Sequence, residues 1–417
     1  MIQVYKFGGA SVQNSAGIKN VCQIISQRNP MNLLVVVSAI GNTTNLLEKL
    51  TSNYMKGLET GSILNEIRQT HYSILHELFD NNDPVFDDVE NTFVEIDWML
   101  EDEPHENYDF VYDQIVSVGE LLSTKIISAW LTKCGVKNKW IDARSLIYTD
   151  NSYREAQVDW NKTSLEIKKQ LPGLIGQAIG ITQGFIGSTS ENFTTTLGRE
   201  GSDYSAAIIS SCIGAESLTV WKDVPGIFNA DPKLFPQAVK FDSLSYREAL
   251  EMTYYGANII HPKTIKPLQN AGIPLHVKPY DYPDQPGTVI SPGTSSVNVP
   301  AIIIKKRQVL ISISTRDHSF ITETHLSDIF DSFAGCKIKI NAMQNSAISF
   351  SACFDLVEHA FEKLKERLSI NYLFRYNEDV QLITIRHFKQ DLIDELSAGK
   401  TIMLEQLSRI TAQLVVK

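Results

Sequence analysis

Short apolar runs alternate with longer amphipathic stretches in the first two thirds of the chain. Residues 33–37 are continuously apolar, residues 179–187 are largely apolar, and residues 2–7 are rich in strand-favouring side chains. Continuous apolar character is typical of parallel strands that are covered on both faces. Residues 14–27 and 204–211 have helical character and follow two of these runs. The alternation predicts an open, mostly parallel α/β sheet that is sandwiched by helices.

A change of pattern follows residues 279–300, which contain five prolines among glycines and serines and mark a domain boundary. Beyond this boundary, strands and helices predict a β-α-β-β-α order and then a second, shorter set of elements. We therefore expect a smaller α+β domain at residues 301–417. The predicted strands are 308–314, 336–343, 346–354, 371–376, 379–387, 401–406 and 410–416, and the predicted helices are 324–334, 356–369 and 389–397.

Composition narrows the class of protein. The 417 residues suggest two or three domains, and the net charge of −10 argues against nonspecific nucleic-acid binding. The first residues lack signal-peptide architecture, and we expect no apolar run near the roughly 20 residues that span a membrane. The five cysteines are scattered and odd in number, which favours reduced thiols in a cytoplasmic protein over a zinc site. Twelve carboxylates and no Lys or Arg between Asp80 and Asp109 favour a solvated helical surface over a metal cluster.

The densest group of polar side chains lies in residues 194–207, between a predicted strand and a predicted helix. It contains three threonines, two glycines, Arg199, Ser202 and Asp203. We expect Ser202 or Asp203 to cap the helix. A capped strand-to-helix connection would explain part of this group, but a guanidinium at a helix N-terminus favours a site for a carboxylate or phosphate.

Other predicted strands also end in polar loops, where open α/β sheets bind ligands. Lys6 precedes Gly8 and Gly9, whose N–H groups could cradle a phosphate, although the order differs from a Walker loop. A hydroxyl-rich turn begins at Ser38. Glu120 lies in an apolar segment and therefore needs a cationic partner, which could be a ligand or a side chain.

Six segments in this order resemble the aspartate kinases of the amino-acid kinase superfamily. They are KFGGAS, VVSAIGNTTN, SVGELLS, ITQGFIG with TTTLGREGSDYSAA, WKDVPGIFNADPK, and YGANIIHPKT. The resemblance covers residues 1–290 and implies an amino-acid kinase catalytic domain there. Residues 301–417 resemble the paired ACT regulatory modules (ferredoxin-like) of that family, with the second module shortened. We expect His261, beside Pro262, to fix a helix start.

The resemblance implies phosphoryl transfer from ATP, with Mg²⁺ on its phosphates, to the side chain of L-aspartate. This reaction would be the first step towards lysine, threonine and methionine. Lys6 would stabilise the transferring group, and Asp203 would orient Lys6 or the magnesium shell; no protein metal site is implied. Arg199 would hold the α-carboxylate and Glu120 the α-ammonium. The implied substrate-binding residues are Ser38, Thr44, Glu120, Arg199 and Ser202, and the implied ATP-binding residues are Lys6, Gly8, Gly9, Lys222, Asp223, Phe228, Asp231, Lys233 and Asn258.

Several positions depart from the family pattern. Ala10 and Asn258 replace a usual threonine and a usual lysine, and Lys222 replaces a frequent threonine. Asn341 and Ala347 are neutral where lysine-inhibited relatives are acidic, so lysine control, threonine control and no control all remain open.

Two other functions compete with this reading. One is a kinase of the same superfamily acting on N-acetylglutamate, glutamate or carbamate, and the other is a non-catalytic amino-acid sensor. We expect a homodimer or higher homo-oligomer through the ACT modules, and no fused homoserine dehydrogenase domain.

Overall fold

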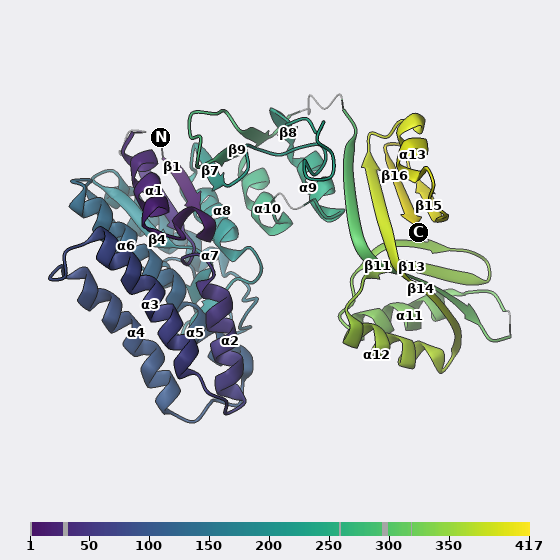
Figure 1. Ribbon diagram of the computed structural model, residues 1–417, viewed down its shortest axis with the longest axis horizontal. Coiled ribbons are helices and arrows are strands. Elements are labelled where there is room, and N and C mark those ends of the chain that lie inside the picture. Colours follow the sequence, from purple (N-terminus) through teal and green to yellow (C-terminus); the bar gives the residue numbers. More distant parts are fainter. Residues whose placement is uncertain (1, 28–31, 258–259, 294–298, 318) are drawn as a thin grey trace. The chain divides into compact units, whose positions relative to one another are not determined.

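The computed structural model describes residues 2–27, 32–257, 260–293, 299–317 and 319–417 (Figure 1). The chain divides into two compact units. Unit 1 comprises Met1–Ile227, Lys240–Leu250 and Ile259–Ser296, and unit 2 comprises Phe228–Val239, Glu251–Asn258 and Val297–Lys417. Each unit is described by itself below.

An eight-stranded sheet forms the centre of the described part of unit 1, with strand order β3-β4-β2-β1-β7-β9-β10-β8. All neighbouring pairs are parallel except β9 and β10. The predicted mostly parallel sheet is therefore confirmed. Its strands are β1 (Gln3–Phe7), β2 (Leu33–Val37), β3 (Asn138–Ile141), β4 (Ile179–Gln183), β7 (Ser217–Lys222), β8 (Ser243–Ser245), β9 (Leu275–Pro279) and β10 (Thr288–Ser291).

Helices cover both faces of this sheet, which explains the continuous apolar runs. On one face, Tyr5, Val35 and Ile181 join a core cluster with side chains from α1 to α6. The alternate residues Val4 and Leu34 are equally buried, and helix α8 contacts β1, β2 and β7. The helices are α1 (Ser15–Gln27), α2 (Thr43–Met55), α3 (Gly61–Leu78), α4 (Val85–Glu101), α5 (Tyr108–Val116), α6 (Val118–Lys133), α7 (Trp160–Ile175), α8 (Gly201–Ile213), α9 (Tyr246–Tyr254) and α10 (Pro262–Ala271), with short 3₁₀ turns η1 (Gly9–Val12) and η2 (Ala143–Ser145).

A small hairpin of β5 (Ile186–Ser188) and β6 (Thr194–Thr196) precedes helix α8. It pairs Ile186 with Thr196 and Ser188 with Thr194. The hairpin therefore occupies the connection between sheet strand β4 and α8, where the sequence predicts a ligand site.

One helical stretch, Tyr108–Lys133, is long and apolar enough to cross a membrane by length and composition. The expectation that no run reaches that length is therefore wrong. The stretch comprises α5 and α6, and 72% of its apolar window is buried inside the protein. Burial in the core accounts for its apolar character.

Unit 2 contains a six-stranded antiparallel sheet in its described residues, with strand order β12-β13-β11-β14-β16-β15. Three helices accompany it, which confirms the predicted α+β class. The elements are β11 (Ala301–Thr315), α11 (Glu323–Gly335), β12 (Ile340–Asn345), β13 (Ser349–Asp355), α12 (Glu358–Ser369), β14 (Tyr372–Arg386), α13 (Gln390–Ser397), β15 (Ile402–Leu407) and β16 (Thr411–Val416).

Three strands of unit 2 have boundaries that differ from the prediction, and one of them, expected at 336–343, begins at Ile340 because Cys336 still caps α11. Strand β11 begins at Ala301, seven residues before the predicted start at 308, and β14 is one strand where two were predicted. Register shifts interrupt the pairing of β11 with β14, and Arg307 and Asp379 have positive φ there. The first five residues of β11 pair with Leu382–Arg386 at the end of β14. The start of β11 therefore supplies a strand to the second, shorter set of elements in this sheet.

Candidate active site

Two lysines and one aspartate meet at the carboxyl ends of β1 and β7. Lys6, the fourth residue of β1, has its Nζ 2.6 Å from Oδ1 of Asp203. Lys222, the last residue of β7, has its Nζ 3.7 Å from Oδ2 of the same carboxylate. The side chains of Lys6 and Asp203 are only 10% and 4% exposed. Two ammonium groups are thus fixed side by side by one buried carboxylate.

The charge of Asp203 depends on these lysines. Burial opposes ionisation of the carboxyl, but the nearby charges of Lys6 and Lys222 outweigh burial and lower its pKa. Asp203 is therefore ionised at neutral pH and attracts both ammonium groups. Neither Ser202 nor Asp203 caps α8, contrary to the prediction. Glu200 occupies the N-cap position with a φ of 53° and makes no side-chain capping bond.

The glycine loop after β1 packs closely against the loop after β2. The N–H of Gly41 donates to the carbonyl of Gly9 (3.1 Å), and the N–H of Ser38 donates to the carbonyl of Phe7 (3.1 Å). A Cβ on Gly9 would lie 2.8 Å from the carbonyl oxygen of Ala39, which is too close for any side chain. A Cβ on Gly8 would lie 3.5 Å from Nζ of Lys6. Both predicted glycines therefore lie in the loop that follows the lysine that they were expected to assist.

Glu120 is a buried carboxylate in the first turn of α6. Its side chain reaches the loop after β2, where Oε1 accepts a hydrogen bond from the N–H of Ala39 (3.2 Å). Oε2 is buried and has no hydrogen-bond partner among the described residues. Burial raises the pKa of Glu120 to about 8, against the lowering effects of the Ala39 N–H and the Lys6 charge. At neutral pH this buried carboxyl group is therefore mostly protonated, and an incoming ammonium group would favour its ionised form.

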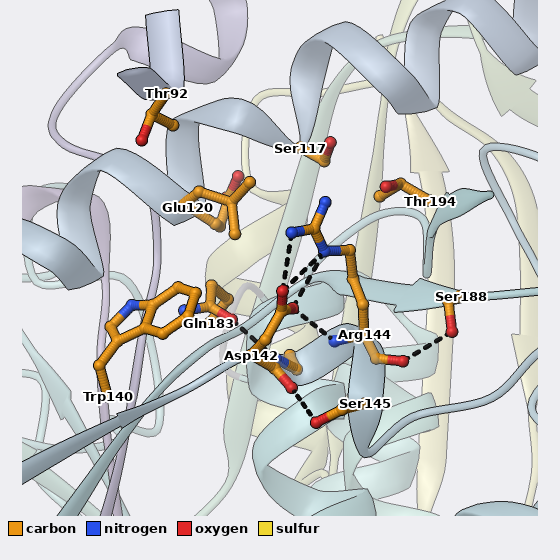
Figure 2. A network of polar contacts seen from close by, with 12 residues as sticks. Thr92, Ser117, Glu120, Trp140, Asp142, Arg144, Ser145, Gln183, Ser188 and Thr194 are labelled. Atoms are coloured by element: carbon orange, nitrogen blue, oxygen red, sulfur yellow. Dashed lines mark hydrogen bonds and ion pairs between the residues drawn. The ribbon is translucent and has the colours of Figure 1, made fainter. Parts of the chain in front are cut away.

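A network of neutral side chains supports the helix turn that carries Glu120, and sequence reasoning missed it. The hydroxyl of Thr124 donates to the Glu120 carbonyl (2.8 Å) and accepts from Nε2 of Gln183 (2.7 Å) and Nε1 of Trp140 (3.0 Å). Gln183 also accepts from the N–H of Ala143 (2.7 Å). Figure 2 shows Glu120 and Gln183 on neighbouring elements of this region. The only sequence signal is that a glutamine ends an apolar strand.

The same view shows an ion pair that begins at the end of β3. Arg144 donates through Nε and Nη2 to the Asp142 carboxylate, with Nη2 at 2.7 Å, and its carbonyl accepts from the Ser188 hydroxyl (2.6 Å) (Figure 2). A cavity of about 310 Å³ is lined by these three residues together with Ser145, Tyr148 and Asn192. The guanidinium is neutralised by its own neighbour, so the cavity has no unpaired charge from this pair.

The remaining predicted substrate residues differ in their surroundings. Thr44 lies in the first turn of α2 and is half-buried, and Ser202 is buried against Gly184, where a Cβ would lie 2.5 Å from the Ser202 Cβ. Arg199 is exposed and forms no hydrogen bond or ion pair with the described residues. Its guanidinium is therefore available to a ligand.

Two of the three threonines that precede Arg199 form side-chain hydrogen bonds inside the protein. Thr195 shares a hydrogen bond with Thr149 (Oγ1 to Oγ1, 2.7 Å), and Thr196 donates its hydroxyl to Asp113 (2.6 Å). The hydroxyls of Thr195 and Thr196 are therefore engaged inside the protein, and they account for part of the dense polar group. His261, by contrast, is the N-cap of α10 and accepts from the N–H of Lys263 (3.2 Å), as predicted.

The predicted ATP-binding residues are divided between the units. Lys222 and Asp223 belong to unit 1, where Asp223 is exposed beyond β7. Phe228, Asp231 and Lys233 belong to unit 2. Asn258 lies outside the described residues. The described part of the chain contains no group of three or more His, Cys, Asp or Glu side chains that could hold a metal ion.

Comparisons with known proteins show which family the chain resembles. The Amino acid kinase family profile matches residues 1–279. Lysine-sensitive aspartokinase 3 of Escherichia coli is 31% identical over 85% of this chain and 78% of its own length. Bifunctional aspartokinase/homoserine dehydrogenase 2 of Arabidopsis thaliana is 31% identical over 88% of this chain, which spans only 41% of that protein.

Solved structures of an aspartokinase match the chain over its full length. E. coli aspartokinase III in complex with aspartate and ADP matches with a TM-score of 0.84 and 27% identity, covering 100% of this chain and 96% of that one. The same enzyme in complex with lysine and aspartate matches equally well.

Proposed function

Because the chain belongs to the amino acid kinase family, and within it to the aspartokinases, we propose that it transfers the γ-phosphoryl group of ATP to the side-chain carboxylate of L-aspartate. The product would be 4-phospho-L-aspartate, and the enzyme would be a phosphotransferase with a carboxyl group as acceptor. This step opens the route to lysine, threonine and methionine. The observation that carries the choice of substrate is the buried, unpartnered Oε2 of Glu120 among the described residues.

The acceptor carboxylate is already ionised at neutral pH, so the reaction requires no general base. The difficulty is to bring two anions together and to stabilise the charge that spreads over the transferring group. Lys6 and Lys222 meet this need, because Asp203 holds both ammonium groups in place before the substrate arrives. The N–H groups of Gly8 and Gly9 assist on the phosphate side.

Substrate recognition uses the two ends of the amino acid. Glu120 receives the α-ammonium, and Arg199 holds the α-carboxylate through the planar fork of its guanidinium. Ser38, Thr44 and Ser202 complete the pocket with hydroxyl groups. Lys222, Asp223, Phe228, Asp231, Lys233 and Asn258 serve the nucleotide.

Mg²⁺ would arrive on the ATP phosphates, where it neutralises part of their charge. The donor set of the protein fits this arrangement better than a resident metal site. Both oxygens of Asp203 already face lysine ammonium groups, so this carboxylate orients the lysines and is not available as a ligand.

Regulation and assembly would belong to residues 301–417. We expect these ACT-like modules to form a homodimer or higher homo-oligomer, since β12 and β15 are sheet edges and Phe320, Met343 and Ile348 are exposed nearby in the chain. We expect only weak binding of lysine. Asn341 is neutral, and Nζ of Lys305 already donates to its Oδ1 (2.9 Å) and lies 3.5 Å from Asp355. A further ammonium group would meet that positive charge.

We propose a cytoplasmic location, which the five unpaired cysteines support. The decisive test of function is ATP turnover by the purified chain with aspartate, glutamate, N-acetylglutamate and carbamate in parallel. Turnover with aspartate alone is expected. Preference for the N-acylated substrate would contradict the role of Glu120, because that substrate has no ammonium group, and absence of turnover with any substrate would favour an amino-acid sensor.

A further inference from the structure

Asp113, on helix α5, is a buried carboxylate that the reaction described above does not use. It is fully buried, and both of its oxygens accept hydrogen bonds from distant parts of the chain. Oδ1 accepts from the hydroxyl of Thr196 (2.6 Å), and Oδ2 accepts from the N–H groups of Thr196 (2.8 Å) and Arg154 (3.0 Å). All three donors are neutral groups. A carboxylate offers acceptors to all three, whereas an amide would turn a donor towards one of them.

The segment that Asp113 holds leads directly to Arg199. Thr196 ends β6, and its carbonyl accepts from the N–H of Ala156 (3.0 Å). Thr194, two residues earlier in β6, bonds to the side chain of Gln114 through its main chain. Its N–H donates to Oε1 of Gln114 (3.1 Å), and its carbonyl accepts from Nε2 of Gln114 (2.8 Å). One edge of β6 pairs with β5, and side chains of α5 take the place of a strand on the other edge.

The second donor to Asp113 belongs to a loop that lies over the same segment. A Cβ on Gly198 would be 3.3 Å from the carbonyl oxygen of Arg154 and 3.1 Å from Cγ of Glu155. The Arg154 guanidinium lies over the ring of Tyr112 (4.3 Å) and pairs with Glu48 on α2 (3.2 Å), one helical turn beyond Thr44. Asp113 thus joins α5 to two segments that contact each other immediately before Arg199.

Arg199 has no hydrogen bond or ion pair with the described residues, so only the main chain fixes the point from which its side chain extends. We propose that Asp113 is a positioning residue for substrate binding, which fixes the Thr196–Arg199 segment so that Arg199 meets the α-carboxylate of the amino-acid substrate. The inference rests on the proposed function, because it requires that Arg199 binds this carboxylate.

Two adjacent threonines provide a matched test in the full-length protein. Thr195 and Thr196 are both fully buried in β6, and the hydroxyl of each makes one side-chain hydrogen bond, but only Thr196 bonds to Asp113. Thr196→Val is expected to raise the KM for aspartate about tenfold while the KM for ATP stays within about twofold. Thr195→Val should leave both KM values near wild type, and Thr196→Ser, which retains the hydroxyl, should restore aspartate binding. Equal effects of Thr195→Val and Thr196→Val on the aspartate KM, or no effect of either, would overturn the inference.

A double-variant cycle separates this inference from the proposed function. Arg199→Ala alone should lower kcat/KM for aspartate by about tenfold or more, and adding Thr196→Val should then lower it by less than about twofold, since both changes act through the same guanidinium. If Arg199→Ala leaves kcat/KM unchanged, the proposed role of Arg199 is wrong. If Arg199→Ala has its expected effect and Thr196→Val lowers kcat/KM independently of it, only the positioning role of Asp113 is wrong.

Discussion

Replacing Glu120 by glutamine should separate a substrate-binding carboxylate from a structural one. The glutamine side chain would be nearly isosteric and could still accept the hydrogen bond from the Ala39 N–H, but it would carry no charge. In the free protein the Glu120 charge is unfavourable, because burial raises its pKa from 4.5 to about 8. The variant should therefore be at least as stable as the wild type, although it loses a buried acidic group.

The size and sign of this effect follow from proton linkage. Between pH 4.5 and about 8 the folded protein retains a proton on Glu120 that the unfolded chain has lost, so this group makes stability fall as pH rises. At 1.36 kcal/mol per pH unit, the difference is up to about 5 kcal/mol at pH 8 and above. Glu120→Gln should remove this loss. Denaturant unfolding of both proteins from pH 5 to 9, without substrate, measures it directly.

Aspartate binding should change in the opposite direction. Loss of a charged hydrogen bond to the ammonium group, worth about 1.5–3 kcal/mol, should raise the KM of the variant for aspartate roughly 10- to 100-fold. Succinate, which lacks the ammonium group, is the matched control and should bind wild type and variant with similar affinity. In the wild type the aspartate KM should fall as pH rises towards 8, since neutral Glu120 must release its proton to pair with the ammonium. A less stable variant with an unchanged aspartate KM would refute this reasoning and make Glu120 a structural residue.

Three further outcomes test other parts of the molecule. Lys6→Ala should lower kcat on the order of 100-fold or more while the protein remains folded by circular dichroism, and near-normal turnover would rule out its proposed role. His71 is fully buried, and burial lowers its pKa to about 4. Because the unfolded chain takes up this proton first, the free energy of unfolding should fall by about 2 kcal/mol as pH falls from 6.5 to 5. His71→Gln should lose less stability over this range, and equal pH profiles of the two proteins would contradict the prediction. Calorimetric titration of the full chain should give a lysine Kd of millimolar or weaker, because Asn341 and Ala347 carry no negative charge and Lys305 places a positive charge at Asn341. Sub-millimolar lysine binding that inhibits turnover would disprove this.

The sequence predicted the sheet and the residues at its strand ends, because both leave local signals. Apolar runs define β2 and β4, and glycines and charged side chains next to such runs mark the loops that follow them. Lys6 and Asp203 could be proposed as partners only through the family resemblance, since 197 positions separate them in the chain. The resemblance implied that Asp203 orients either Lys6 or the magnesium shell, and the structure shows its ion pair with Lys6.

The missed features depend on contacts that have no local signature. Asp113 is one acidic residue on an amphipathic helix, and its partner Thr196 lies 83 positions away. The hydroxyls of Thr195 and Thr196 suggested a ligand site because of their density, but their hydrogen bonds are internal. Strand β14 was divided in two because polar residues around Asp379 resemble a turn, whereas the chain passes through this point with a single positive φ and continues the same strand.

The two buried carboxylates nearest the proposed reaction have opposite pKa shifts, and the difference lies in their partners. Burial acts in the same direction on both, yet two lysines lower the pKa of Asp203, whereas the partly satisfied Glu120 has its pKa raised to about 8. The phosphate side of the site is therefore charged and paired before any ligand binds, and the amino-acid side lacks one cation. An aspartate ammonium supplies that cation and releases a proton from Glu120, so aspartate binding should depend on pH through this residue. A substrate without an ammonium group leaves Glu120 protonated and gains nothing from it, which is a physical basis for selecting the amino acid over its deaminated analogue.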